Sequence, residues 1–282
     1  MRNGFRRWEI AAPLILVCVF WPRGALAQSA EGANGSGTTA AKIIATMLEM
    51  NHERQEALDS YISDRTYQVR YTGTGGEHHA EIRVHAEYGG PDRKKLTVVS
   101  ESGSKFLCEK VLRKIVDGEL EAAGTTNRMQ MTLSPENYSA ELVGEEKVET
   151  PDGGQGVRAW VLKMTPRVDN KFMYRGKVWI SQDDYAVMRI QGEPAKSPSW
   201  WISRASFESR YVRRGEIWLP GKNVSSSHVR IGGEATLTID YGTYPIVAAR
   251  ALKTLTQSAE ERHPDGTPVF ISGMPDAARE GR

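Results

Sequence analysis

The spacing of apolar positions changes from a helical period to a strand period after Tyr61. Between Ala40 and Tyr61 apolar residues recur every three to four positions, which predicts an amphipathic helix, and they are Ile43, Ile44, Met47, Leu48, Ala57, Leu58 and Tyr61. From Tyr67 onward apolar and polar residues alternate over most of the remaining sequence. This alternation is typical of antiparallel strands with one buried face and one wet face.

One helical segment interrupts the alternating region. Its apolar positions follow helical spacing, and they are Phe106, Cys108, Val111, Leu112, Ile115, Val116 and Leu120. We expect this helix to cover a sheet. The strands that we predict lie at 67–71, 78–88, 94–101, 128–133, 139–143, 157–164, 172–180, 186–190, 201–212, 217–220, 223–231 and 234–244.

Strand follows strand through short turns, so the fold class is mainly β within the α+β class. A parallel sheet would require a helix at every crossover, and the chain has too few helical segments for that. We therefore predict a strongly curved antiparallel half-barrel whose helices cover the concave face.

The first 27 residues have the composition of a cleaved secretory signal peptide. Arginines at the start precede an apolar run from Ile10 to Trp21 that is too short to span a bilayer, and small residues stand at Ala25 and Ala27. Cleavage would leave Gln28 first and place the protein in the periplasm. An uncleaved anchor and a lipoprotein acylated at Cys18 are the less favoured alternatives, because prolines interrupt the apolar run and bulky residues precede the cysteine.

Removal of the signal peptide takes four arginines and one glutamate, so the formal net charge changes from +2 to −1. A neutral mature protein gives no reason to expect nucleic acid as a partner. Cys108 would be the single remaining cysteine, which excludes an internal disulfide bond. We expect it to be an apolar filler on its helix.

The chain divides into four parts by composition. After the signal peptide (1–27), the small polar residues 28–39 form a flexible linker, residues 40–247 form one domain, and residues 248–282 form a C-terminal tail. The tail holds a single short apolar patch, at Val269–Ile271, so we expect it to add little stability. We expect a monomer.

The chain lacks the sequence signatures of the common enzyme classes. It contains neither a GxSxG nucleophile turn nor a phosphate-binding glycine loop that opens a helix,. The acids Asp183 and Asp184 lie in a turn, where they favour local hydrogen bonds. His79, Glu81 and His85 are spread along one strand, which favours a solvated face over a metal site. We therefore expect no catalysis, no cofactor and no metal, although distant residues could still converge in an all-β enzyme.

Large aromatic residues are the more informative feature. Trp201, Phe207 and Tyr211 share one face of a predicted strand, and Trp201 leaves a proline-containing loop, which suits the rim of an apolar cavity. Trp218 follows on the next strand. Core packing is the alternative, and we favour it for Trp160 and Trp179.

The segment 177–224 resembles the LolA/LolB-like superfamily of lipoprotein-sorting proteins. A strand pair with a "vWi..dd..v.ri.G" pattern precedes a "f....y...g.wlP" hairpin, matched here by Val178, Trp179, Ile180, Asp183, Asp184, Arg189, Ile190, Gly192, Phe207, Tyr211, Gly215, Trp218, Leu219 and Pro220. The stretch from Ile246 onward departs from the family, whose carriers are usually shorter.

The resemblance implies a helix-lidded half-barrel that holds acyl chains of lipoproteins or lipids. The implied function is a periplasmic carrier that works toward the outer membrane with a membrane-bound donor or acceptor protein. The predicted ligand-binding residues are Trp201, Phe207, Tyr211 and Trp218. The alternative is a periplasmic sensor of lipid or lipoprotein that regulates a membrane partner through a stable complex.

Overall fold

The structure is a computed structural model that describes residues 38–73, 75–90, 93–149, 156–197, 202–230 and 232–250. The predicted signal peptide, almost all of the predicted linker and most of the predicted tail lie outside these ranges, and so does Trp201.

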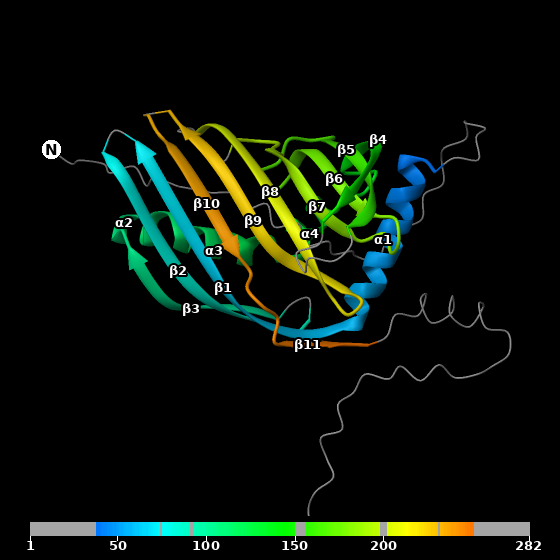
Figure 1. The fold of residues 1–282 in the computed structure, drawn as a ribbon, viewed down its shortest axis with the longest axis horizontal. Coiled ribbons are helices and arrows are strands. Elements are labelled where there is room, and N and C mark those ends of the chain that lie inside the picture. Colours follow the sequence, from blue (N-terminus) through cyan, green and yellow to red (C-terminus); the bar gives the residue numbers. More distant parts are fainter. Residues whose placement is uncertain are drawn as a thin grey trace, which may run out of the picture.

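The described residues form one antiparallel sheet of eleven strands (Figure 1) in the order β3-β2-β1-β10-β9-β8-β7-β6-β5-β4, with β11 paired to β1 beyond the end of β10. The strands are β1 (Leu58–Gly73), β2 (Gly76–Tyr88), β3 (Lys94–Gly103), β4 (Tyr138–Val148), β5 (Val157–Pro166), β6 (Tyr174–Ser181), β7 (Val187–Pro194), β8 (Ile202–Arg214), β9 (Ile217–Val229), β10 (Glu234–Asp240) and β11 (Ile246–Ala249). In this part of the chain β3 and β4 each pair with a single strand, so the sheet is open.

Helices cover one face of the sheet at two places. They are α1 (Ala40–Ala57), α2 (Lys105–Leu107), a π-helical turn η1 (Cys108–Leu112), α3 (Arg113–Ala122) and α4 (Thr125–Met131). The buried side of α1 joins an apolar cluster with residues of β4–β8, whereas α2–α3 join a second cluster, mainly with residues of β1, β2, β9 and β10. Figure 1 shows α2 and α3 across the β1–β3 end and α1 at the opposite end.

Strand register identifies this covered face across the middle of the sheet. Ser209 pairs with Asn223, Asn223 with Ile239, and Ile239 with Tyr67. The Tyr67 hydroxyl donates a hydrogen bond to Glu119 of α3 at 2.6 Å, so the row faces the helices. We call this helix-bearing face the concave face. The predicted curved antiparallel half-barrel of the α+β class is confirmed.

The first helix is shorter than predicted. It ends at Ala57, and β1 begins at Leu58 without a loop. Tyr61 was placed on the helix, but it lies in β1 and stacks on Tyr88 of β2 with ring centroids 4.9 Å apart. Burial follows a period of two from Tyr61 onward, through Ser63, Arg65 and Tyr67. Two of these buried residues are polar, so hydrophobicity alone concealed the start of the strand.

The predicted strand at 128–133 is wrong, because Thr125–Met131 forms helix α4. Apolar residues at alternating positions 129, 131 and 133 imitate a strand pattern. Met131 and Leu133 are buried, whereas Met129 is 46% exposed. The Asn127 side chain donates to the carbonyl of Glu121 and thereby ties α4 to the end of α3.

The second helical segment is confirmed as a cover of the sheet, with Cys108 buried as expected. Phe106, predicted on its apolar side, is 65% exposed. The π-helical turn η1 begins at Cys108, two residues after Phe106. Such a turn inserts an extra residue into the helical repeat and rotates the preceding positions away from the buried side.

Several strand boundaries also differ from the prediction, including the ends of β4 at Val148 and of β7 at Pro194. Residues 217–229 form a single strand, because the register with β8 shifts between Arg210 and Tyr211 and this bulge accommodates Pro220,. In contrast β10 ends at Asp240, before the predicted end at Tyr244. None of the helices in the described ranges has the length and hydrophobicity needed to cross a bilayer.

Candidate functional site

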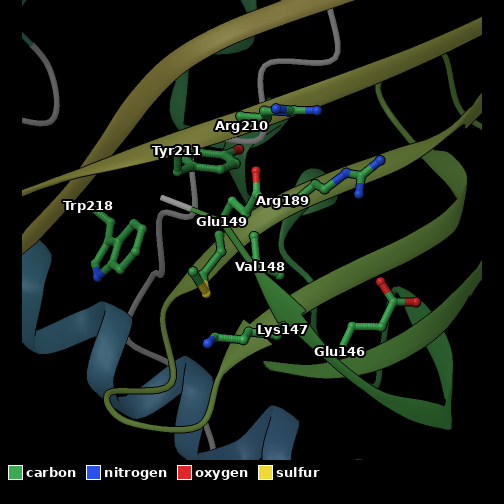
Figure 2. A pocket seen from close by; sticks show the side chains of 9 residues that line it. Glu146, Lys147, Val148, Glu149, Arg189, Arg210, Tyr211 and Trp218 are labelled. Carbon is green, nitrogen blue, oxygen red and sulfur yellow. The ribbon is translucent and has the colours of Figure 1, made fainter. Parts of the chain in front are cut away.

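A pocket of about 250 Å³ opens where two neighbouring strands stop pairing. The β7–β8 ladder covers only residues 189–192 and 207–210. Bulges flank it in both adjoining ladders, between Trp179 and Ile180 and between Arg210 and Tyr211. The residues that line the pocket are Glu146, Lys147, Val148, Glu149, Met188, Arg189, Arg210, Tyr211 and Trp218, and Figure 2 shows them.

Trp218 connects the pocket wall to the first helix. Its indole Nε1 donates a hydrogen bond to Asp184 Oδ2 at 2.8 Å. Asp184 also contacts Arg54 of α1: the Arg54 guanidinium donates to the backbone carbonyl of Asp184 and lies 3.5 Å from Asp184 Oδ2. Both charged side chains are buried. In Figure 2 Trp218 stands beside the blue α1 helix. The pocket and the position of α1 are therefore coupled through one carboxylate.

Electrostatics keep that carboxylate charged. Burial raises the pKa of Asp184, but hydrogen bonding to Ser181, the charge of Arg54 and the Trp218 donor outweigh burial, and the net pKa is lowered. The next residue, Tyr185, holds a φ of 55°, which is unusual for a residue with a side chain. Its ring packs 5.0 Å from Trp160. The turn between β6 and β7 is thus held in one conformation by contacts on both sides.

Glu146, Arg189 and Arg210 point away from α1, whereas the Lys147 side chain extends toward the side of the helix in Figure 2. Arg189 lies over the Trp179 ring at 4.6 Å and pairs with Glu208 at 2.7 Å. Glu146 accepts a hydrogen bond from Trp179 Nε1 at 2.8 Å. Figure 2 shows the guanidinium groups of Arg189 and Arg210 pointing away from the helix. The pocket therefore has an apolar and aromatic side near α1 and a charged rim.

The structure brings two of the four predicted ligand-binding residues together. Tyr211 and Trp218 both line the pocket. Phe207 lies deeper on the same strand, buried and edge-on to Tyr174 at 5.5 Å. Trp201 lies outside the described residues. Sequence reasoning missed Met188 and the end of β4. Both line the pocket, but neither belongs to the β8–β9 hairpin that carries Tyr211 and Trp218.

The concave face between the two apolar clusters carries a column of polar residues on β9. We call Asn223, Ser225 and Ser227 the β9 seam. Asn223 Nδ2 donates to Ser209 Oγ of β8 at 2.7 Å, and Ser225 Oγ donates to Asn223 Oδ1 at 3.2 Å. Asn223 and Ser209 are buried, whereas Ser225 and Ser227 are half-buried.

A buried ionic cluster attaches α3 to the sheet. Glu119 of α3 pairs with Arg65 of β1, and it accepts hydrogen bonds from Lys94 Nζ at 2.7 Å and Tyr67 Oη at 2.6 Å. Burial raises the pKa of Glu119, but the positive charges of Lys94 and Arg65 outweigh burial and lower the pKa to about 2. The carboxylate therefore stays ionised under ordinary conditions, and α3 is held by charge as well as by apolar contacts.

Ser225, Cys108 and His85 are nucleophilic or titratable side chains with contacts to neighbouring protein groups. The Ser225 hydroxyl donates to Asn223 rather than to a base. Burial raises the pKa of the Cys108 thiol, which disfavours the reactive thiolate. His85 lies 2.7 Å from Asp64 on the sheet surface. The part of the chain that the structure describes holds no group of three side chains suited to a metal ion.

No family model and no curated protein matches the sequence. Among solved structures, the chain is similar to a LolA superfamily protein from Nitrosomonas europaea, with 11% identity, a TM-score of 0.32 and coverage of 78% of this chain and 97% of that one. It is also similar to an outer membrane lipoprotein-sorting domain from Vibrio parahaemolyticus, with 10% identity, a TM-score of 0.35 and coverage of 74% and 92%.

A third similarity is to the MucA/MucB complex of Pseudomonas aeruginosa, with 12% identity, a TM-score of 0.23 and coverage of 75% of this chain and 99% of that one. The LolA-like resemblance in the sequence thus recurs among solved structures.

Proposed function

We propose that the concave face binds acyl chains and that the protein carries lipoproteins or lipids through the periplasm toward the outer membrane. The supporting observation is the division of that face into two apolar clusters, one under α1 and one under α2–α3. The two clusters border each other at β9, where Ser225 pairs with Phe207 of the first cluster and with Leu237, which packs against the second. This is the place where a ligand can lie under both helices.

The energetics of acyl chains fit a helix-covered sheet. Each methylene withdrawn from water contributes about 0.8 kcal/mol, so a carrier needs a face that helices can cover after the ligand enters. Here α1 is fastened through Arg54 and Asp184, and α3 through Glu119 and Arg65. When a ligand displaces a helix, the separated ionic side chains are hydrated by water, and the same ion pairs can form again when the helix returns.

The proposed lining residues follow from the sequence and the pocket. Phe207 and Tyr211 belong to the apolar cluster under α1, and Trp218 packs against that cluster. Tyr211 and Trp218 also line the pocket, whose Arg189 and Arg210 lie on the opposite face of the sheet. Trp201, which begins the segment that leads into β8, is proposed as a rim residue. Replacing Trp201 with Ala should weaken binding of a fluorescent fatty acid about tenfold, with less loss of stability than the ~3–5 kcal/mol for an emptied core site.

A matched pair of charge substitutions tests whether the concave face is the binding surface. Leu237 is half-buried and shares the concave face with Ser225, whereas Thr236 is its exposed neighbour on the opposite face. Leu237→Arg should weaken binding of a fluorescent fatty acid by tenfold or more, because a guanidinium resists contact with hydrocarbon. Thr236→Arg should bind as the parent does. Equal affinities for both variants would contradict the proposal.

The carrier and the regulator differ in their partners. A carrier exchanges lipid with a membrane-bound donor or acceptor and releases it, so cross-linking in cells should capture brief contacts with outer-membrane assembly proteins. A stoichiometric complex with an inner-membrane protein that persists through purification would support the regulator instead.

A further inference from the structure

Asn223 of the β9 seam belongs to a row of concave residues that runs across the strands and is otherwise almost entirely apolar. The concave row that contains it runs through Leu162, Val178 and Ile190 on one side and through Ile239, Tyr67 and Ile82 on the other. Only Ser209 and Asn223 interrupt it. A surface that binds hydrocarbon alone would be apolar at these positions too, since an amide buried without full hydrogen bonding costs free energy.

The hydrogen bonds of the seam leave donors unused. The Asn223 amide has two N–H groups, and one of them bonds Ser209,. The Ser209 hydroxyl accepts that bond, and its own hydrogen remains available. The Ser225 hydroxyl donates its hydrogen to Asn223 Oδ1. The buried end of the seam therefore keeps two donors that no protein group in the described ranges accepts, one N–H of Asn223 and the hydroxyl hydrogen of Ser209, beside acceptor lone pairs on the same side chains,. An uncharged carbonyl oxygen matches these two donors.

Access to these donors runs along the strand. Burial increases from the half-buried Ser227 and Ser225 to the buried Asn223. Large apolar side chains stand on both sides, with Phe207 on β8 opposite Ser225 and Leu237 on β10 opposite the same residue. A ligand that enters between the helices would keep its hydrocarbon on these side chains and place a polar linkage over β9.

We propose that Asn223 and Ser209 recognise the carbonyl of an acyl linkage, an ester or an amide, and thereby select acylated ligands over plain alkyl chains. This inference rests on the proposed binding of acyl chains. It adds that binding specificity comes from hydrogen bonds to the carbonyl oxygen, donated by Asn223 Nδ2 and Ser209 Oγ. Ser225 holds the amide in orientation through Oδ1.

The test compares a diester phospholipid with its diether analogue of equal chain length, both with the same headgroup and fluorophore. The ether lacks the carbonyl and leaves the hydrocarbon unchanged. The parent protein should bind the diester about tenfold more tightly, which corresponds to about 1.4 kcal/mol and to one or two neutral hydrogen bonds. Asn223→Leu should reduce this preference to about twofold or less and leave affinity for the diether unchanged or higher.

The control is Ser226→Ala, a neighbouring position that is exposed on the other face, and it should keep the full preference. Urea unfolding of each variant checks that it is folded. Equal binding of diester and diether by the parent protein would overturn the carbonyl inference and leave acyl binding intact. Failure of the parent to bind either lipid would overturn the proposed function as well.

Discussion

At the residue scale, single polar groups attach the covering helices. Asp184 accepts from Trp218 and pairs with Arg54, so one buried carboxylate joins β9, the β6–β7 turn and α1. In the same way, the carboxylate of Glu119 joins α3 to β1 and β3 through its ion pairs with Arg65 and Lys94. Both carboxylates are surrounded by donors, which is the condition under which buried charge is tolerated.

Replacement of Trp218 by Phe should destabilise the protein by about 2 kcal/mol, because a hydrogen bond to a buried carboxylate is lost while a smaller aromatic ring remains at the position. Urea unfolding monitored by circular dichroism measures the change. A double-mutant cycle with Asp184→Asn separates this contact from packing, because Trp218→Phe should cost less in a chain in which the carboxylate is already replaced by a neutral amide. An equal cost in both backgrounds would show that the Asp184 contact has no special weight.

Stability should fall with pH below about 4.5 because of Glu119. Its folded pKa is depressed from 4.5 to about 2, so the stabilisation is complete above the unfolded value and disappears as pH falls toward 2. The amount is on the order of 3 kcal/mol. Glu119→Gln should lose stability at pH 7, since Arg65 and Lys94 keep a buried charge without a counterion.

The measurement is the free energy of unfolding in urea at pH 5 and at pH 3. The difference between these two values should shrink in Glu119→Gln. Glu121→Gln, an exposed position on the same helix, should behave as the parent does. An unchanged pH dependence in Glu119→Gln would refute the assignment.

At the scale of elements, sequence patterns identified most strands but not the points where one type of structure passes into another. The alternation from His78 to Tyr88 predicted β2 almost completely. The start of β1 was missed because its buried face carries Ser63 and Arg65, whose burial depends on Glu119 and on other distant partners. Helix α4 was missed because Met129 and Met131 alternate by chance.

The candidate site shows the same limit. Tyr211 and Trp218 could be named from the hairpin that they share, whereas Val148 and Met188 join them only through the curvature of β4 and the separation of β7 from β8. Such contacts depend on bulges, and no local residue pattern encodes a bulge reliably. Sequence reasoning did not single out the β9 seam, because its neighbours on β8 and β10 follow only from strand register.

The last described strand, β11, should matter more than the residues that follow it. It pairs with β1 at Leu58–Ile62, and the backbone N–H of Arg250 donates to Ala57 at the end of α1. Truncation after Leu252 retains these contacts and should shift the thermal midpoint by only a few degrees. Truncation after Tyr244 removes them and should lower it by at least twice as much. Differential scanning calorimetry compares the two, and equal midpoints would show that β11 is dispensable.

At the scale of the whole molecule, helices cover an open curved sheet at two places, and a separate apolar cluster lies under each group of helices. The apolar positions of the sheet continue between these clusters and are interrupted by the β9 seam. In this arrangement the few helices of a mainly β chain are attached to the sheet by buried ion pairs as well as by apolar contacts. The arrangement also supports the proposal that a ligand with acyl chains occupies the face between them.

The most direct test is native mass spectrometry of the mature protein, purified from the host envelope without detergent. The account predicts a protein that begins at Gln28 and carries an additional mass equal to a phospholipid or an acylated peptide, released on collisional activation. A homogeneous ligand-free protein that also fails to take up lipid from vesicles would contradict the central claim.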